Sequence, residues 1–305
     1  MRLFGRTNID FMGQRKLWYT VSASVILIGL VSLFIKGVDY GIDFLGGTEL
    51  IVHFNEPVGI GDVRTAMDAI GYGKAEIKTF GSTRDILVRT VEQGEGNTVG
   101  DRIRSGLAER FLQNPFIVLK EDKIGPKVGA ELRRDALYAV IASLVAIWIY
   151  VGFRFKFIYG VGAVVALFHD VLVTLGIVSI CDGLLNLEIN QSMVAAFLTL
   201  VGLSVNDTVV IFDRIRENQK IFRSMPLKDL MNKSLNETLS RTIITSGTVF
   251  IVLAVLLMFG GEVNRGFAFA LTIGIVTGTY SSIYIASAIA LEWGMRGKGN
   301  AKLID

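Results

Sequence analysis

Six stretches of this 305-residue chain are long and apolar enough to cross a membrane as helices. The hydrocarbon core of a bilayer is about 30 Å thick, and a helix needs about 20 apolar residues to cross it. With 51% hydrophobic residues, the chain is also more apolar than an ordinary soluble domain. The sequence therefore predicts an integral membrane protein. The expected spans are 17–35, 136–153, 158–180, 192–212, 242–259 and 267–293.

Lysine and arginine residues are concentrated in alternate connections between these spans, and this pattern predicts the orientation of the chain. Cytoplasmic connections of membrane proteins carry an excess of such residues. The loop 181–190 has no basic residue, and the loop 260–266 has only Arg265. Both termini are therefore expected in the cytoplasm. The basic residues that support this orientation are Arg2, Arg6, Arg15, Lys16, Arg154, Lys156, Arg214, Arg216, Lys220, Arg223, Lys228, Lys233, Arg296, Lys298 and Lys302.

The spans divide the chain into five predicted parts. These are a cytoplasmic N-terminus at 1–16, a first transmembrane helix at 17–36, an extracytoplasmic domain at 37–134, a five-helix transmembrane bundle at 135–293 with a cytoplasmic loop at 213–241, and a cytoplasmic C-terminus at 294–305. No A-x-A-like site follows the first span, so a cleavable signal is not expected. The net charge of +3 reflects the loop asymmetry and does not indicate nucleic-acid binding. The lone Cys181 cannot form an internal disulfide.

Residues 37–134 show the pattern of a small α+β domain. Strands are expected at 48–54, 74–80, 85–91 and 115–124, and helices at 60–71 and 97–111. The order β-α-β-β-α-β is the ferredoxin-like arrangement. Asn97 is expected to cap the second helix, and His53 to be a strand residue rather than a ligand. We find no metal-ligand cluster, phosphate-binding loop or nucleophile constellation here, so a contact surface is expected rather than an enzyme.

Two spans carry small residues at about one-turn spacing, which predicts close helix packing. Membrane helices approach one another through small faces because no hydrophobic force drives them together. We therefore expect the fourth and last spans in the interior of the bundle, with Asn206 and Asp207 pointing at least partly away from lipid. The two stripes are Ser192, Ala196, Thr199, Gly202 and Asn206, and Gly266, Ala270, Gly274, Gly278 and Ser282.

Asp207 requires an explanation, because a carboxylate at the bilayer centre costs about 2.5–3.5 kcal/mol on insertion scales. Arg241, at the cytoplasmic start of the fifth span, is expected at a comparable depth because the two helices run antiparallel. Two interpretations remain open. The pair either binds and releases a proton as its geometry changes, or forms a static ion pair that fixes helix register. Arg241 could instead extend to the cytoplasmic interface.

His169 and Asp170 lie near the middle of the third span. A proton relay is one interpretation, because histidine titrates near neutrality. Hydrogen bonds to other helices are the favoured alternative, since adjacent residues on a helix point about 100° apart and face different neighbours. Asp213, beside Arg214 and Arg216, is expected to be an ordinary interfacial carboxylate.

Several longer motifs together resemble one known family. They are DYGIDFLGGTEL at 39–50, GPKVGAELRRDAL at 125–137, ALFHDVLVTLG at 166–176, VNDTVVIFDRIREN at 205–218, LSRTIITS at 239–246 and FGGEVNRGFAFALTIGIVTGTYSSIYIAS at 259–287. In this order they resemble the SecF branch of the SecD/SecF family of bacterial protein-export membrane proteins, in the resistance-nodulation-division superfamily.

The resemblance implies a function and a set of partners. It implies a heterodimer with SecD, association with the SecYEG channel (often with YajC and YidC), and use of the proton-motive force to assist preproteins across the bacterial inner membrane. The proton is then the coupling ion, and no other cofactor is expected. The proton-relay positions of the family match Asp207 and Arg241, and a further aspartate of that path belongs to SecD. From the residues alone, Asn206, His169 and Asp170 are weaker candidates.

Other functional classes remain as alternatives. A half-transporter for a small molecule or lipid would need a ligand pocket in the domain at 37–134, where no apolar cleft is evident. A purely structural subunit would stabilise SecD without handling protons. An enzyme is the least favoured class.

Overall fold

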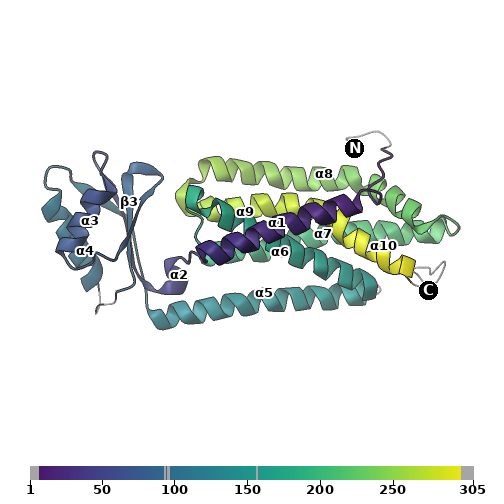
Figure 1. The fold of residues 1–305 in the computed structure, drawn as a ribbon, viewed down its shortest axis with the longest axis horizontal. Helices are drawn as coiled ribbons and strands as arrows, with labels where there is room; N and C mark the ends of the chain where they lie inside the picture. The colour runs from purple at the N-terminus through teal and green to yellow at the C-terminus, as the bar shows by residue number, and fades with distance from the viewer. Residues whose placement is uncertain (1–6, 93, 95–96, 156, 297–305) are drawn as a thin grey trace. The chain divides into compact units, whose positions relative to one another are not determined.

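In the computed structural model the chain forms two compact units (Figure 1). The helical unit comprises the residues up to Val38, Tyr138–Leu187 and the residues from Ser192 on, and the sheet unit comprises Asp39–Leu137 and Glu188–Gln191. The structure describes residues 7–92, 94, 97–155 and 157–296. Some basic residues that entered the orientation prediction lie outside these ranges, namely Arg2, Arg6, Lys156, Lys298 and Lys302.

Within the described residues, six helical segments are long and apolar enough to cross a membrane, as the sequence predicts. The last segment is continuous but contains a π-helical turn. The segments are α1 (Arg15–Lys36), α5 (Pro126–Arg154), α6 (Phe157–Leu185), α7 (Gln191–Ile221), α8 (Leu227–Phe259), and α9 (Gly261–Ser281) with η1 (Ser282–Ala286) and α10 (Ser287–Arg296).

The stretch 213–241, for which the sequence suggested a cytoplasmic loop, is mostly helical. Helix α7 continues to Ile221 and α8 begins at Leu227. The apolar pattern ends in this stretch, but charged residues continue both helices and pair along and between them. Arg214 donates to Glu217 and to Glu237, each at 2.7 Å, and ion pairs at such spacing support a helix in water.

Small residues bring the helices of the helical unit close together. The last span is the most buried of the six, which confirms its predicted interior position. A Cβ built at Gly274 would lie 2.6 Å from Leu200 of α7, and one at Gly278 would lie 2.9 Å from Ser204. Helices α1 and α6 also approach closely, since a Cβ at Gly29 would lie 2.5 Å from a Gly176 backbone atom.

The sheet unit is a four-stranded antiparallel sheet with two helices on one face (Figure 1). Its strand order is β2-β3-β1-β4. Asn97 occupies the position before α4 but makes no side-chain capping bond, so the predicted capping interaction is absent there. In chain order the elements are α2 (Ile42–Leu45), β1 (Gly47–Phe54), α3 (Ile60–Ala69), β2 (Glu76–Phe80), β3 (Ser82–Thr90), α4 (Thr98–Arg110) and β4 (Phe116–Ile124).

The two faces of the sheet differ in chemistry. On β1, Leu50 and Val52 pack against α3 and α4 in the apolar core of the unit. Because side chains alternate along a strand, Glu49 lies on the opposite face, where it joins ion pairs rather than apolar side chains. His53 is a β1 residue, as predicted, and its imidazole contacts Asp85 of β3.

Substituting Gly176 tests the contact between α1 and α6. A methyl group at Gly176 would lie 2.9 Å from the Cα of Gly29, so Gly176→Ala should destabilise the protein by about 1–3 kcal/mol through overpacking. Thermal unfolding of the purified chain in detergent measures the loss. Gly152→Ala is the matched control, because a Cβ there meets no atom within 4 Å. Equal melting of the two variants would contradict the close approach.

Candidate functional site

Asp207 is buried between α7 and α8, with only 6% of the residue exposed. Its Oδ2 accepts a hydrogen bond from the Ser246 hydroxyl of α8 at 2.9 Å. A buried carboxylate in a membrane-spanning helix is retained only when hydrogen bonds or charges compensate its burial. The expected inward orientation of Asp207 is therefore confirmed, and Ser246 is its direct partner.

Arg241 and Asn206 do not join this contact. Both residues are exposed on the surface of the chain. Among the ion pairs of the described residues, none links Arg241 to Asp207, although the two residues lie on neighbouring helices. Asn206 is exposed on the chain by itself, so its orientation away from lipid stays a prediction. Ser192, Thr199 and Gly202 of the same predicted stripe are exposed as well, while Ala196 is buried.

A second buried carboxylate, Asp170, lies on α6 with 1% of the residue exposed. Its Oδ2 accepts hydrogen bonds from Ser204 of α7 at 2.5 Å and from Ser281 of α9 at 2.8 Å. Its Oδ1 lies 3.0 Å from Nδ1 of His169. Asp170 thus connects α6 with α7 and α9. Hydrogen bonds between helices are the favoured interpretation of this site, and the structure contains them.

The hydrogen bonds continue from His169 to α1. The His169 Nε2 lies 3.0 Å from the Tyr280 hydroxyl, which lies 3.2 Å from the Ser22 hydroxyl. In a neutral imidazole, Nδ1 donates to the carboxylate and Nε2 accepts from the tyrosine. Sequence reasoning did not identify these hydroxyl partners, because serine and tyrosine are ordinary residues in membrane helices and only the fold brings them to a carboxylate.

The sheet unit holds a third polar cluster, centred on Arg89 of β3. The residue is 3% exposed. It contacts Glu49 of β1 at 2.6 Å, Glu76 of β2 at 3.1 Å, and Glu188 from the connection between α6 and α7. A buried guanidinium with several carboxylate partners is strongly held, because charge-assisted hydrogen bonds are about twice as strong as neutral ones.

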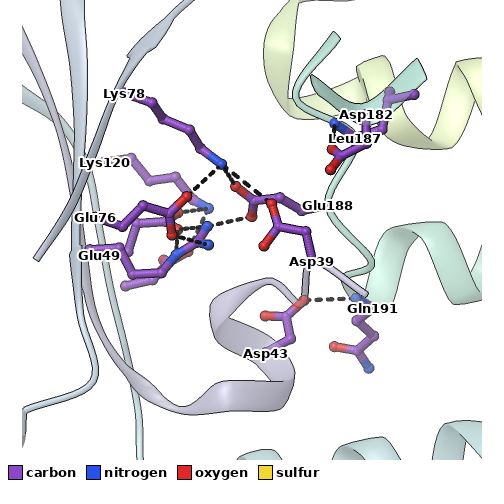
Figure 2. A network of polar contacts seen from close by, with 12 residues as sticks. Asp39, Asp43, Glu49, Glu76, Lys78, Lys120, Asp182, Leu187, Glu188 and Gln191 are labelled. Atoms are coloured by element: carbon purple, nitrogen blue, oxygen red, sulfur yellow. Dashed lines mark hydrogen bonds and ion pairs between the residues drawn. The ribbon is translucent and has the colours of Figure 1, made fainter. Parts of the chain in front are cut away.

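Lys78 lies beside this cluster and contacts a group of carboxylates (Figure 2). The ligand atoms of Asp39, Glu76 and Glu188 lie within 4.8 Å of one another, a spacing that could hold a metal ion. The Lys78 ammonium, however, is 3.0 Å from Glu76 and 3.9 Å from Asp39, and it also contacts Glu188. The lysine therefore supplies the positive charge that a cation would provide.

The charges of the cluster shift the pKa values of its members. Burial alone would raise the pKa of Glu76, but the charges of Lys78 and Arg89 lower it below the ordinary range. Burial alone would lower the pKa of Lys78 and Arg89, but the neighbouring carboxylates, first of all Glu188, raise both. Glu76, Lys78 and Arg89 are therefore ionised at neutral pH.

Comparison with known proteins identifies the family. The family model of the SecD/SecF C-terminal region of protein export membrane proteins matches residues 108–296, and the model of the SecD/SecF GG motif matches residues 31–58. A protein translocase subunit SecF from Rhodothermus marinus is 45% identical over 305 residues, covering 99% of both chains. The chain belongs to the SecD/SecF family.

Other members agree in sequence and in fold. The SecF subunits of Vibrio alginolyticus and Pseudomonas aeruginosa are 41% and 38% identical, covering 95% and 93% of this chain and 91% of each relative. The crystal structure of SecDF, a translocon-associated membrane protein from Thermus thermophilus, matches 95% of this chain with 36% identity and a TM-score of 0.85. A second SecDF structure, in a super-membrane-facing form, has 37% identity and a TM-score of 0.68, covering 96% of this chain. This SecD/SecF family member spans 39% of each SecDF chain.

The pKa shifts in the ion-pair cluster predict how the stability of the sheet unit depends on pH. Glu76 has a lower pKa in the folded protein than in the unfolded chain, so its contribution is present above about pH 4.3 and is lost as the pH falls through the lowered value. Hydrogen-exchange protection of β2 and β3 in the full chain, corrected for intrinsic rates, should therefore decrease in acid. Glu76→Gln should weaken protection at neutral pH and flatten this decrease, whereas the exposed Glu109→Gln should follow the unmodified protein. If protection depended on pH in the same way in all three proteins, Glu76 would not contribute to the stability of the sheet unit.

Proposed function

We propose that this chain is a SecF-type subunit that works with SecD and uses the proton-motive force to assist the translocation of preproteins. Membership of the SecD/SecF family supports the protein-export role, and relatives of the same length carry the name protein translocase subunit SecF. The likeness to part of the longer SecDF chains supports SecD as the partner, because it leaves more than half of those chains for a SecD portion.

The observation that carries the proton-coupled role is the buried Asp207. Its carboxylate lies within a membrane-spanning helix and accepts a hydrogen bond from a neutral serine. No ion pair fixes its charge among the described residues. A carboxylate in such surroundings can change its protonation state when its neighbours move, whereas a static structural ion pair would keep it charged. This geometry favours a group that takes up and releases a proton.

The exposed Arg241 supports a partner at this side of the bundle. A guanidinium that faced hydrocarbon would cost about 2.5–3.5 kcal/mol on insertion scales. The exposed residues of α7 around Asn206 are small or polar, which suits close contact with another membrane helix. We infer that SecD covers this surface, formed by Ser192, Thr199, Gly202, Asn206 and Arg241, and that its side chains bring the proton path together with Asp207.

The remaining features of the proposal concern placement. The basic residues of alternate connections support a multi-pass protein of the bacterial inner membrane with both termini in the cytoplasm. The sheet unit is then extracytoplasmic, and its element order and strand order support a ferredoxin-like domain. Association with SecYEG, and with YajC and YidC, follows from the family resemblance. The proton is the coupling ion, and no further cofactor is proposed.

The energy available per proton limits the mechanism. One charge that crosses a potential of 100 mV gains about 2.3 kcal/mol, and each unit of pH difference adds about 1.4 kcal/mol per proton. Shifting a two-state element from mostly one state to mostly the other needs about 5.5 kcal/mol. At such gradients we expect a complete conformational change to use several protons per cycle, or free energy from binding of the preprotein.

Replacing Asp207 by asparagine tests the central proposal. The amide keeps the shape and can still accept from Ser246, but it cannot bind a proton at neutral pH. Asp207→Asn should abolish proton-driven stimulation of preprotein translocation in membrane vesicles and should leave co-purification with SecD unchanged. Normal stimulation by this variant would instead support a purely structural subunit.

Replacing Arg241 by lysine tests whether charge alone is sufficient. Lysine keeps the positive charge but loses the planar guanidinium that binds a carboxylate through two parallel hydrogen bonds. We expect Arg241→Lys to reduce translocation by about tenfold or more, corresponding to the loss of about 1.4 kcal/mol. The same vesicle assay measures this, with Arg102→Lys, an exposed residue of α4, as the control. Full activity of Arg241→Lys would show that only the charge is needed.

A further inference from the structure

Most of the short connection between α6 and α7 belongs to the sheet unit, although both helices lie almost entirely in the helical unit. The segment assigned to the sheet unit is Glu188–Gln191, and its last residue begins α7. Its backbone pairs with the segment that follows α1. The Ile189 N–H donates to the Asp39 carbonyl at 2.8 Å, and the Gly41 N–H donates to the Ile189 carbonyl at 3.0 Å. The connection is therefore held by residues that lead directly into the sheet.

The Glu188 side chain attaches this connection to the sheet itself. Its carboxylate contacts Lys78 of β2 and Arg89 of β3 (Figure 2 shows Glu188 and Lys78 facing each other). The three side chains are largely shielded from water, with 13% of Glu188, 17% of Lys78 and 3% of Arg89 exposed. Ion pairs are stronger in such surroundings than at an open surface. The attachment therefore resists displacement.

A second contact holds the first residue of α7. The Gln191 N–H donates to Oδ2 of Asp43 at 2.8 Å (Figure 2). The first N–H groups of a helix have no partner within the helix, so a carboxylate there satisfies a group that would otherwise be unpaired. The helix that begins at this contact is the one that carries Asp207.

The sheet does not depend on Glu188 for its own ion pairs. Without this residue, Arg89 keeps its contacts with Glu49 at 2.6 Å and Glu76 at 3.1 Å, and Lys78 keeps its contact with Glu76 at 3.0 Å. Glutamates of the strands therefore already pair with Arg89 and Lys78, and Glu188 is not needed to stabilise the sheet. What Glu188 adds is a connection from the strands to the chain segment between α6 and α7.

We propose that Glu188 is the positioning residue through which a movement at the start of α7 reaches the sheet unit, with Asp43 as the second point of attachment. This inference rests on the proposed function, since it describes how a change at Asp207 leads to movement of the sheet unit. The coupling contacts are those of the Glu188 carboxylate with Lys78 of β2 and Arg89 of β3.

The first experiment replaces Glu188 by glutamine in the full chain together with SecD in inverted membrane vesicles. Proton uptake and preprotein translocation are measured on the same vesicles. Glu188→Gln should lower proton-driven translocation by about fivefold or more, the lower end of coupling between two sites, while proton uptake continues. Glu109→Gln, an exposed glutamate of α4, is the control and should change neither measurement.

A covalent attachment provides the rescue. A Cβ at Gly41 would lie 3.0 Å from the Cβ of Asn190, so cysteines at both positions reach disulfide spacing of about 3.5–4.5 Å after a small shift. In a Cys181→Ser background, Glu188→Gln with Gly41→Cys and Asn190→Cys should regain translocation when oxidised and lose it again when reduced. Proton uptake retained in the reduced protein separates this role from a folding defect, because a misfolded protein would lose both measurements.

The outcomes separate this inference from the proposed function. Loss of translocation with retained proton uptake, restored by the disulfide, supports the coupling role. Unchanged translocation in Glu188→Gln, equal loss of both measurements, or no restoration by the disulfide would overturn it. Normal proton-driven translocation in Asp207→Asn would overturn the proposed function, whatever the result at Glu188.

Discussion

The requirement to satisfy polar groups in hydrocarbon determines the organisation of the helical unit. A membrane helix cannot leave a carboxylate unpaired, because no water is present to solvate it. Asp170 meets this requirement with hydroxyl groups from two other helices and the neighbouring imidazole, and Asp207 with one hydroxyl group. The small residues of the last span follow from the same requirement, since hydrogen bonds between helices need backbones that lie close together.

The two carboxylates differ in how completely their surroundings hold them. Asp170 accepts bonds from three side chains on three helices, so a change there would disturb much of the bundle. Asp207 has a single partner on α8, and the residues expected to complete its site face outward. Under the proposed function, this difference fits a structural role for Asp170 and a variable protonation state for Asp207.

The features that follow from local pattern could be predicted from the sequence. The number of spans and the succession of strands and helices along the sheet unit depend on apolar stretches and alternation, and both are visible one segment at a time. The exposure of Asn206 and Arg241 could not be predicted, because helix rotation depends on neighbouring helices. Glu188 gave no signal in the sequence, since its partner Arg89 lies 99 positions away and nothing in the loop indicates a pairing. The end of the apolar pattern at 213 predicts a loop, because hydropathy does not distinguish a loop from charged helical residues in water.

The π-helical turn in the last span affects how that helix meets its neighbours. A wider turn accommodates one extra residue, which rotates everything after it by about 100° relative to an uninterrupted α-helix. Before the turn, glycines face α7; within it, Tyr284 stacks on Trp18 of α1 with ring centroids 4.8 Å apart, and the Ala286 carbonyl lies against Gly162 of α6. The last span thereby contacts α7, α1 and α6 along its length. Deleting one residue here would misdirect the contacts made after the turn while leaving the length and hydropathy of the span almost unchanged.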